Sequence, residues 1–135
     1  MNPLSWLLDH TIGWLFDHTI GLMAERIHER TAGRQRRRDD LAALADTLAD
    51  AVGQCASVWR GYVANETFVT KARVLCPKAS ALTTRIADDD LTRLTRLTTD
   101  AIGAFLEDRG GNREPYTKAY TEVSDRITAL QKALR

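Results

Sequence analysis

The sequence is poor in the residues on which most catalytic and metal sites depend. It contains three histidines, none of them beyond His28, and two cysteines, Cys55 and Cys76, in 135 residues. Two cysteines far from any histidine do not match the ligand spacing of a zinc finger. A glycine-rich phosphate loop and a nucleophile elbow are also missing. We therefore expect a protein that is not an enzyme, with no catalytic residue, no metal site and no cofactor.

The sequence also has few prolines, few aromatic residues and almost no net charge. None of the three prolines falls between Pro3 and Pro77, which permits long helices, and an aromatic content of 7% disfavours a β-sandwich. The formal net charge of +1 gives no overall field for binding nucleic acid, so nucleic acid is not an expected partner. We expect an all-α protein.

The two cysteines bear on the redox environment. A secreted domain held together by disulfides would contain more of them. We expect Cys55 and Cys76 to be reduced, with a single bridge between them as the open alternative.

The most distinctive stretch is a tandem octapeptide near the N-terminus. WLLDHTIG at residues 6–13 is followed directly by WLFDHTIG at residues 14–21, and the two copies differ only at Leu8 and Phe16. As a helix, this stretch has a wide apolar face and a narrow polar stripe. We predict that residues 1–24 form a helix that associates with a membrane or with another copy of the chain. The residues expected to make this association are Trp6, Leu8, Ile12, Trp14, Phe16 and Ile20.

The polar residues of the repeat weigh against a simple membrane span. A 22-residue helix is about 33 Å long, enough to cross a bilayer, but each aspartate costs up to about 3 kcal/mol at its centre. The remaining alternatives are a helix lying in the membrane interface, insertion as an oligomer, and packing on protein alone.

An Asp-His pair in each copy invites a metal or proton-relay interpretation. Successive copies on a helix are rotated by about 80°, so equivalent side chains do not line up. A polar axis in a symmetric oligomer that conducts ions or protons remains an alternative. That axis would consist of Asp9, His10, Asp17 and His18.

Residues 25–40 form a basic, polar neck with six arginines and almost no apolar residues. Its arginine cluster can bind the phosphates of anionic lipids, or it is simply a solvated surface. The residues concerned are Arg34, Arg36, Arg37 and Arg38. With an anchor before the neck, the positive-inside rule places residues 25–135 in the cytoplasm.

Residues 41–135 predict an antiparallel bundle of three long helices. The first should run from residue 41 to about residue 74 and end before Cys76-Pro77, followed by a shorter segment at 78–87. Its expected core-facing seam is Leu41, Ala45, Leu48, Val52, Cys55, Trp59 and Tyr62.

The other two helices have clear start and stop signals. Asp88-Asp89-Asp90 should cap the second helix, and Gly110-Gly111-Asn112 should end it. Pro115 suits the first turn of the third helix. The expected core residues are Leu91, Leu94, Leu97, Ile102, Phe105 and Leu106 on the second, and Tyr116, Tyr120, Val123, Ile127, Leu130 and Leu134 on the third.

These features favour a membrane-associated helical adaptor, or a subunit of a membrane assembly, attached by its N-terminal helix. The partners expected are a second copy of the chain or another helical protein, together with anionic lipid. Two alternatives stay open: a soluble module for oligomerisation or partner binding, and an ion- or proton-conducting homo-oligomer.

Overall fold

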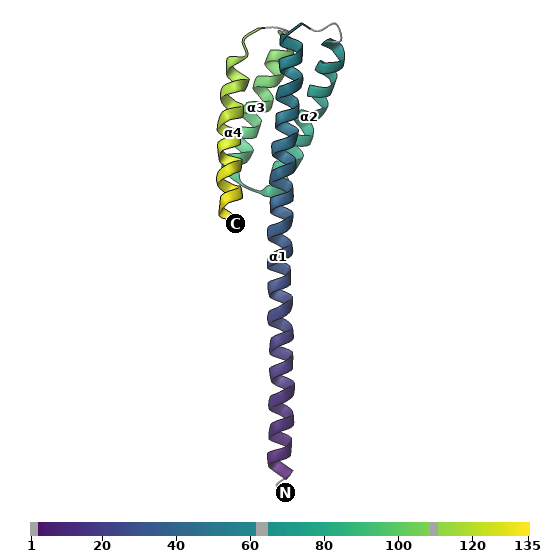
Figure 1. Ribbon diagram of the computed structural model, residues 1–135, viewed down its shortest axis with the longest axis vertical. Coiled ribbons are helices and arrows are strands. Elements are labelled where there is room, and N and C mark those ends of the chain that lie inside the picture. Colours follow the sequence, from purple (N-terminus) through teal and green to yellow (C-terminus); the bar gives the residue numbers. More distant parts are fainter. Residues whose placement is uncertain (1–2, 62–64, 109–110) are drawn as a thin grey trace. The chain divides into compact units, whose positions relative to one another are not determined.

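The backbone is helical throughout the part of the chain that can be described. The computed structural model describes the backbone of residues 3–61, 65–108 and 111–135, and the side chains of these residues from Arg30 on, except Asn65. Four helices and no strand occur in these ranges, which confirms the all-α class. They are α1 (Pro3–Trp59), α2 (Asn65–Ile86), α3 (Asp89–Glu107) and α4 (Glu114–Ala133), as Figure 1 shows.

The chain divides into two compact units, Met1–Arg36 and Arg37–Arg135. The first unit consists of the N-terminal part of α1. The second contains the rest of α1 together with α2, α3 and α4. The predicted division into residues 1–24, 25–40 and 41–135 remains a prediction.

In the second unit, the helices pack side by side as a bundle (Figure 1). Their connections are short, so consecutive helices run in opposite directions. Two apolar clusters fill the interior. The lower cluster consists of Leu41, Leu44, Leu48, Ala79, Leu82, Ile86, Leu91, Leu94, Val123 and Ile127. The upper cluster consists of Ala51, Cys55, Val58, Val69, Ala72, Ile102, Phe105, Leu106 and Tyr116.

The prediction of one helix from residue 41 to residue 74 is wrong, because α1 ends at Trp59 and α2 begins at Asn65. Gly61 adopts a left-handed conformation with φ of 72°, which glycine tolerates without steric cost. Its N–H donates to the carbonyl of Val58 at 3.0 Å. This is the usual way for a helix to close with a glycine, and the signal lay in Gly61 rather than in the apolar pattern.

The predicted break at Cys76-Pro77 is also wrong, since Pro77 lies inside α2. A proline there removes one backbone hydrogen bond and costs about 3 kcal/mol relative to alanine. The helix buries Ala72 before the proline and Ala79 and Leu82 after it, and this packing offsets the cost. The predicted segment 78–87 therefore belongs mostly to α2, and four helical segments, rather than three, build the bundle.

The expected seam on α1 is shifted to one side. The residues of α1 that are most deeply buried alternate at spacings of three and four: Leu41, Leu44, Leu48, Ala51, Cys55 and Val58. The predicted seam residues Ala45 and Val52 are half-buried beside this stripe, and Trp59 is 44% exposed. Trp59 was therefore wrongly predicted as a core residue, while Tyr62 lies outside the described residues.

Helices α3 and α4 follow the sequence-based prediction closely. Asp88 is the N-cap of α3, where its carboxylate accepts the N–H of Leu91 at 2.8 Å, which confirms the predicted cap. Pro115 lies in the first turn of α4, as expected. Of the predicted core residues, Leu97 is 47% exposed instead of buried, and Tyr120, Leu130 and Leu134 are half-buried against the lower cluster.

Candidate functional site

The side chains of the tandem octapeptide lie outside the described residues. The backbone of residues 3–29 is helical, and nothing further is described for them. The predicted association surface and the predicted polar axis therefore stay predictions. The residues concerned are Trp6, Leu8, Asp9, His10, Ile12, Trp14, Phe16, Asp17, His18 and Ile20. Within the part of the chain that the structure describes, no helix combines the length and apolar content needed to cross a membrane.

The arginine cluster is described and is largely solvent-facing. Arg34 and Arg36 are exposed in the first unit, and in the second unit Arg38 is exposed and Arg37 is half-buried. All four lie on the continuous helix α1. Their cationic groups are thus accessible to an anionic partner, as a phosphate site requires.

Arg38 also ties α1 to the end of α4. Its guanidinium donates a hydrogen bond to the main-chain carbonyl of Leu134. Carbonyls in the last turn of a helix have no partner within the helix, and a cation near them is favoured by the helix dipole. Arg38 therefore fixes the lower end of the α1–α4 pair.

At the upper end of the same helix pair, Arg113 lies over Trp59. The guanidinium carbon is 3.6 Å from the centre of the indole ring, a cation–π contact. Arg113 is also the N-cap residue of α4, although its side chain makes no capping hydrogen bond. The contact explains why a large aromatic side chain is placed at the rim of the bundle instead of in its core.

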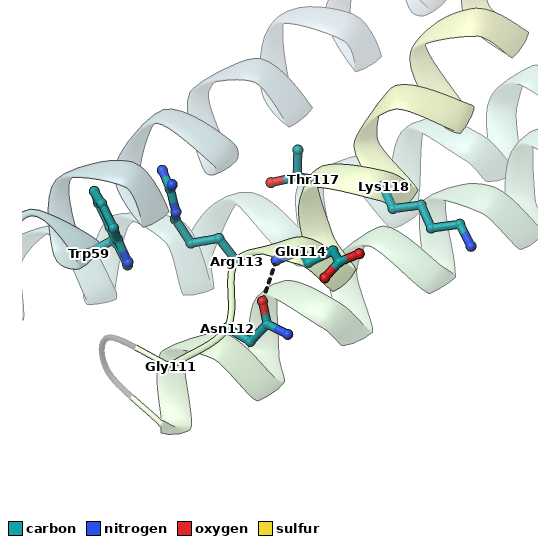
Figure 2. Close-up of a pocket in the computed structure, with 7 residues that line it drawn as sticks. All are labelled: Trp59, Gly111, Asn112, Arg113, Glu114, Thr117 and Lys118. Atoms are coloured by element: carbon teal, nitrogen blue, oxygen red, sulfur yellow. Dashed lines mark hydrogen bonds between the residues drawn. The ribbon is translucent and has the colours of Figure 1, made fainter.

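A shallow pocket of about 580 Å³ opens beside this contact (Figure 2). It is lined by Trp59, Gly111, Asn112, Arg113, Glu114, Thr117 and Lys118. The first turn of α4 does not offer a strong anion site here. Asn112 Oδ1 already accepts the N–H of Glu114 at 2.9 Å, Pro115 has no N–H, and the Glu114 carboxylate repels anions. In Figure 2, the side chain of Lys118 extends away from Trp59.

The two cysteines are free thiols, as expected. Cys55 is buried on α1 and Cys76 is half-buried on α2, next to the same upper cluster. Burial, with a smaller contribution from Cys76, raises the pKa of the Cys55 thiol to about 12, and burial also raises the pKa of Cys76. Neither thiol is activated as a nucleophile, because nucleophilic cysteines have a lowered pKa.

Two ion pairs hold the lower end of the bundle together. Arg85 on α2 lies 3.2 Å from the carboxylate of Asp40 on α1. Arg126 on α4 donates to both carboxylate oxygens of Asp88, at 3.2 and 2.8 Å. The hydrogen bonds from Arg126 hold the pKa of Asp88 below its ordinary value, helped by the Leu91 N–H and the charge of Arg37 and opposed by partial burial.

Asp88 is therefore explained as the cap of α3 and the partner of Arg126, while Asp89 and Asp90 lie in the first turn of α3, where the helix dipole favours negative charge. Among the described side chains, no group of three His, Cys, Asp or Glu residues is placed to hold a metal ion.

Comparison with protein-family models finds no family that matches this chain, and comparisons with curated proteins and with solved structures likewise find no match.

Sequence reasoning missed the Arg38–Leu134 and Trp59–Arg113 contacts between α1 and α4, although a signal for them exists. Heptad-spaced positions run along both helices. They are Arg38, Ala45, Val52 and Trp59 on α1, and Arg113, Tyr120, Ile127 and Leu134 on α4.

Proposed function

We propose that this chain is a non-enzymatic, membrane-associated helical adaptor, attached at the membrane interface by its N-terminal helix. The helical bundle at residues 37–135 is then the part that is held near the membrane and presented to partners. In this proposal residues 25–135 lie on the cytoplasmic side.

The observation that carries the proposal is the exposure of the arginines in the neck that follows the apolar repeat. Arg34 and Arg36 are exposed on α1 and follow an octapeptide repeat rich in Trp, Leu, Ile and Phe. An amphipathic helix with adjoining cations gains both from burying apolar side chains and from attraction to anionic lipid. The aspartates of the repeat favour the interface over a span, because they are costly at the centre of a bilayer.

The bundle supports a role in presentation. Both apolar clusters draw their members from residues 41–127, so the second unit has a core of its own. The pKa of both thiols is raised, which supports a function without covalent catalysis.

Flotation with lipid vesicles tests this proposal on the full chain. The apolar-face variant is Ile12→Glu with Phe16→Glu, and its matched control on the polar stripe is His10→Gln with His18→Gln. We expect the wild type and the control to float with vesicles containing phosphatidylserine. The apolar-face variant should bind at least about 100-fold more weakly, because each buried side chain of this size contributes roughly 1.5–3 kcal/mol.

A wild-type chain that stays at the bottom of the gradient at low salt overturns the proposal. If the same apolar-face variant also dissociates an oligomer in the absence of lipid, the helix instead mediates self-association.

A further inference from the structure

We propose that a basic corner of the bundle, where α1 meets the C-terminal end of α4, contacts the anionic membrane surface. The basic corner consists of Arg37, Arg38, Lys132 and Arg135. This inference rests on the proposed function and adds Lys132 and Arg135, which are remote in sequence, to Arg37 and Arg38 of the neck as a lipid-contacting surface.

The fold brings the two halves of the basic corner together across almost one hundred residues of sequence. The hydrogen bond from Arg38 to the carbonyl of Leu134 places the end of α4 beside α1. The backbone turns at this end, where the N–H of Arg135 donates to the carbonyl of Lys132 at 3.2 Å. The side chains of Arg38, Lys132 and Arg135 are exposed, and Arg37 is half-buried.

Most of the nearby carboxylates are paired with other cations. Asp40 pairs with Arg85, and Asp88 pairs with Arg126. Asp90, at the start of α3, lies 4.0 Å from Arg93. The other exposed acidic side chains at this end are Asp39 on α1 and Asp89 on α3. The four basic side chains of the basic corner outnumber these two, which gives a cationic surface suited to anionic headgroups.

The upper end of the bundle is less suited to this role. There, Arg113 is engaged with Trp59, and Glu107, Asp108 and Glu114 are exposed. Chain connectivity also favours the basic corner, because Arg36 directly precedes Arg37 and continues the run of arginines from the neck. The run of arginines therefore continues in sequence from the first unit into the basic corner.

A charge-matched pair of variants tests the inference on the full chain. The corner variant is Lys132→Gln with Arg135→Gln. The control variant is Lys118→Gln with Arg60→Gln, which removes the same two charge types from exposed positions near the upper end. Each is measured with vesicles of phosphatidylcholine containing 30% phosphatidylserine and with phosphatidylcholine alone, as well as with inorganic phosphate as a competitor.

We expect the corner variant to bind phosphatidylserine vesicles about 25-fold more weakly than wild type, roughly fivefold for each charge removed near the surface. The control variant should change binding less than twofold, and millimolar inorganic phosphate should not displace the wild type. Equal affinity of corner variant and control overturns the inference but leaves the proposed function standing, provided the wild type still floats. Displacement by phosphate at low concentration identifies a free-anion site and overturns it as well. A wild type that binds no vesicle overturns both.

Discussion

Arg113 lies over Trp59 at one end of the α1–α4 pair, and Arg38 donates a hydrogen bond to the carbonyl of Leu134 at the other end. The number of residues between these two contacts is the same on both helices. Arg38 and Trp59 are 21 residues apart on α1, and Arg113 and Leu134 are 21 residues apart on α4. At 1.5 Å per residue both spacings equal about 32 Å. The two helices therefore run antiparallel in a constant register, which places Ala45 opposite Ile127 and Val52 opposite Tyr120.

The Trp59–Arg113 contact should contribute measurably to stability. In a double-mutant cycle with Trp59→Ala and Arg113→Ala, we expect a coupling free energy of about 0.5–1 kcal/mol, as for exposed cation–π pairs. Urea unfolding of the four proteins gives this value. The matched cycle with Lys118→Ala in place of Arg113→Ala should show coupling near zero. Equal coupling in both cycles would show that Trp59 gains nothing specific from Arg113.

The Asp88–Arg126 pair should make stability depend on acid pH. The pKa of Asp88 is lowered in the folded chain, so its contribution is complete above about pH 4, the unfolded value. It is lost as the pH falls through the lower folded value. Asp88→Asn keeps a good helix cap but loses the charge, so we expect it to lose about 1 kcal/mol at pH 7.

Thermal unfolding of wild type and Asp88→Asn between pH 2 and pH 7 checks this effect. The two curves should converge toward low pH. A stability difference that is constant over the whole range would contradict the assigned role of the charge.

Ala87 joins α2 to α3 in a left-handed conformation, with φ of 57°. This conformation costs a residue with a Cβ about 1–2 kcal/mol, and part of the gain on substitution is offset by the greater freedom of glycine in the unfolded chain. Ala87→Gly should therefore raise the free energy of unfolding by about 0.5–1 kcal/mol. As a control, Ala81→Gly at an exposed position inside α2 should lower it by about 1 kcal/mol. A destabilising Ala87→Gly would disprove the turn geometry.

Cys55 and Cys76 should not form a disulfide in the native chain. The pKa of both thiols is raised, mainly by burial, so the thiolate that attacks a disulfide is scarce while the chain is folded. An internal bridge lowers the mass of the protein by two hydrogens. Treatment with oxidised glutathione should not cause this loss under native conditions, whereas in urea the bridge should form. A native bridge found by peptide mapping would refute this protection by burial.

The predictions were correct where the signal is local and wrong where the structure depends on residues that are distant in sequence. The boundaries of α3 and α4 were predictable because Asp88 and Pro115 act locally, through capping and a fixed φ. The position of the α1–α2 boundary was not, because Pro77 looked like the stronger breaker. Its cost is met by long-range packing around Ala79 and Leu82, which a single sequence does not display.

The register of α1 was ambiguous for a similar reason. Ala45 and Val52 are as apolar as the neighbouring Leu44 and Ala51, so periodicity alone cannot say which pair faces the core. The answer depends on α4, which covers the flank that ends at Trp59. The contact of Arg38 with Leu134 likewise depends on chain segments that are distant in sequence, so the basic corner was not visible before the fold.

Attachment at the membrane interface is tested most directly by the fluorescence of the two tryptophans of the repeat, Trp6 and Trp14. In the full-length Trp59→Phe variant they are the only tryptophans, since the sequence contains three. With vesicles containing phosphatidylserine, their emission should shift to shorter wavelength, and lipids brominated high on the acyl chain should quench it more than lipids brominated near the bilayer centre. Unchanged emission and no quenching at saturating lipid would contradict the proposed attachment.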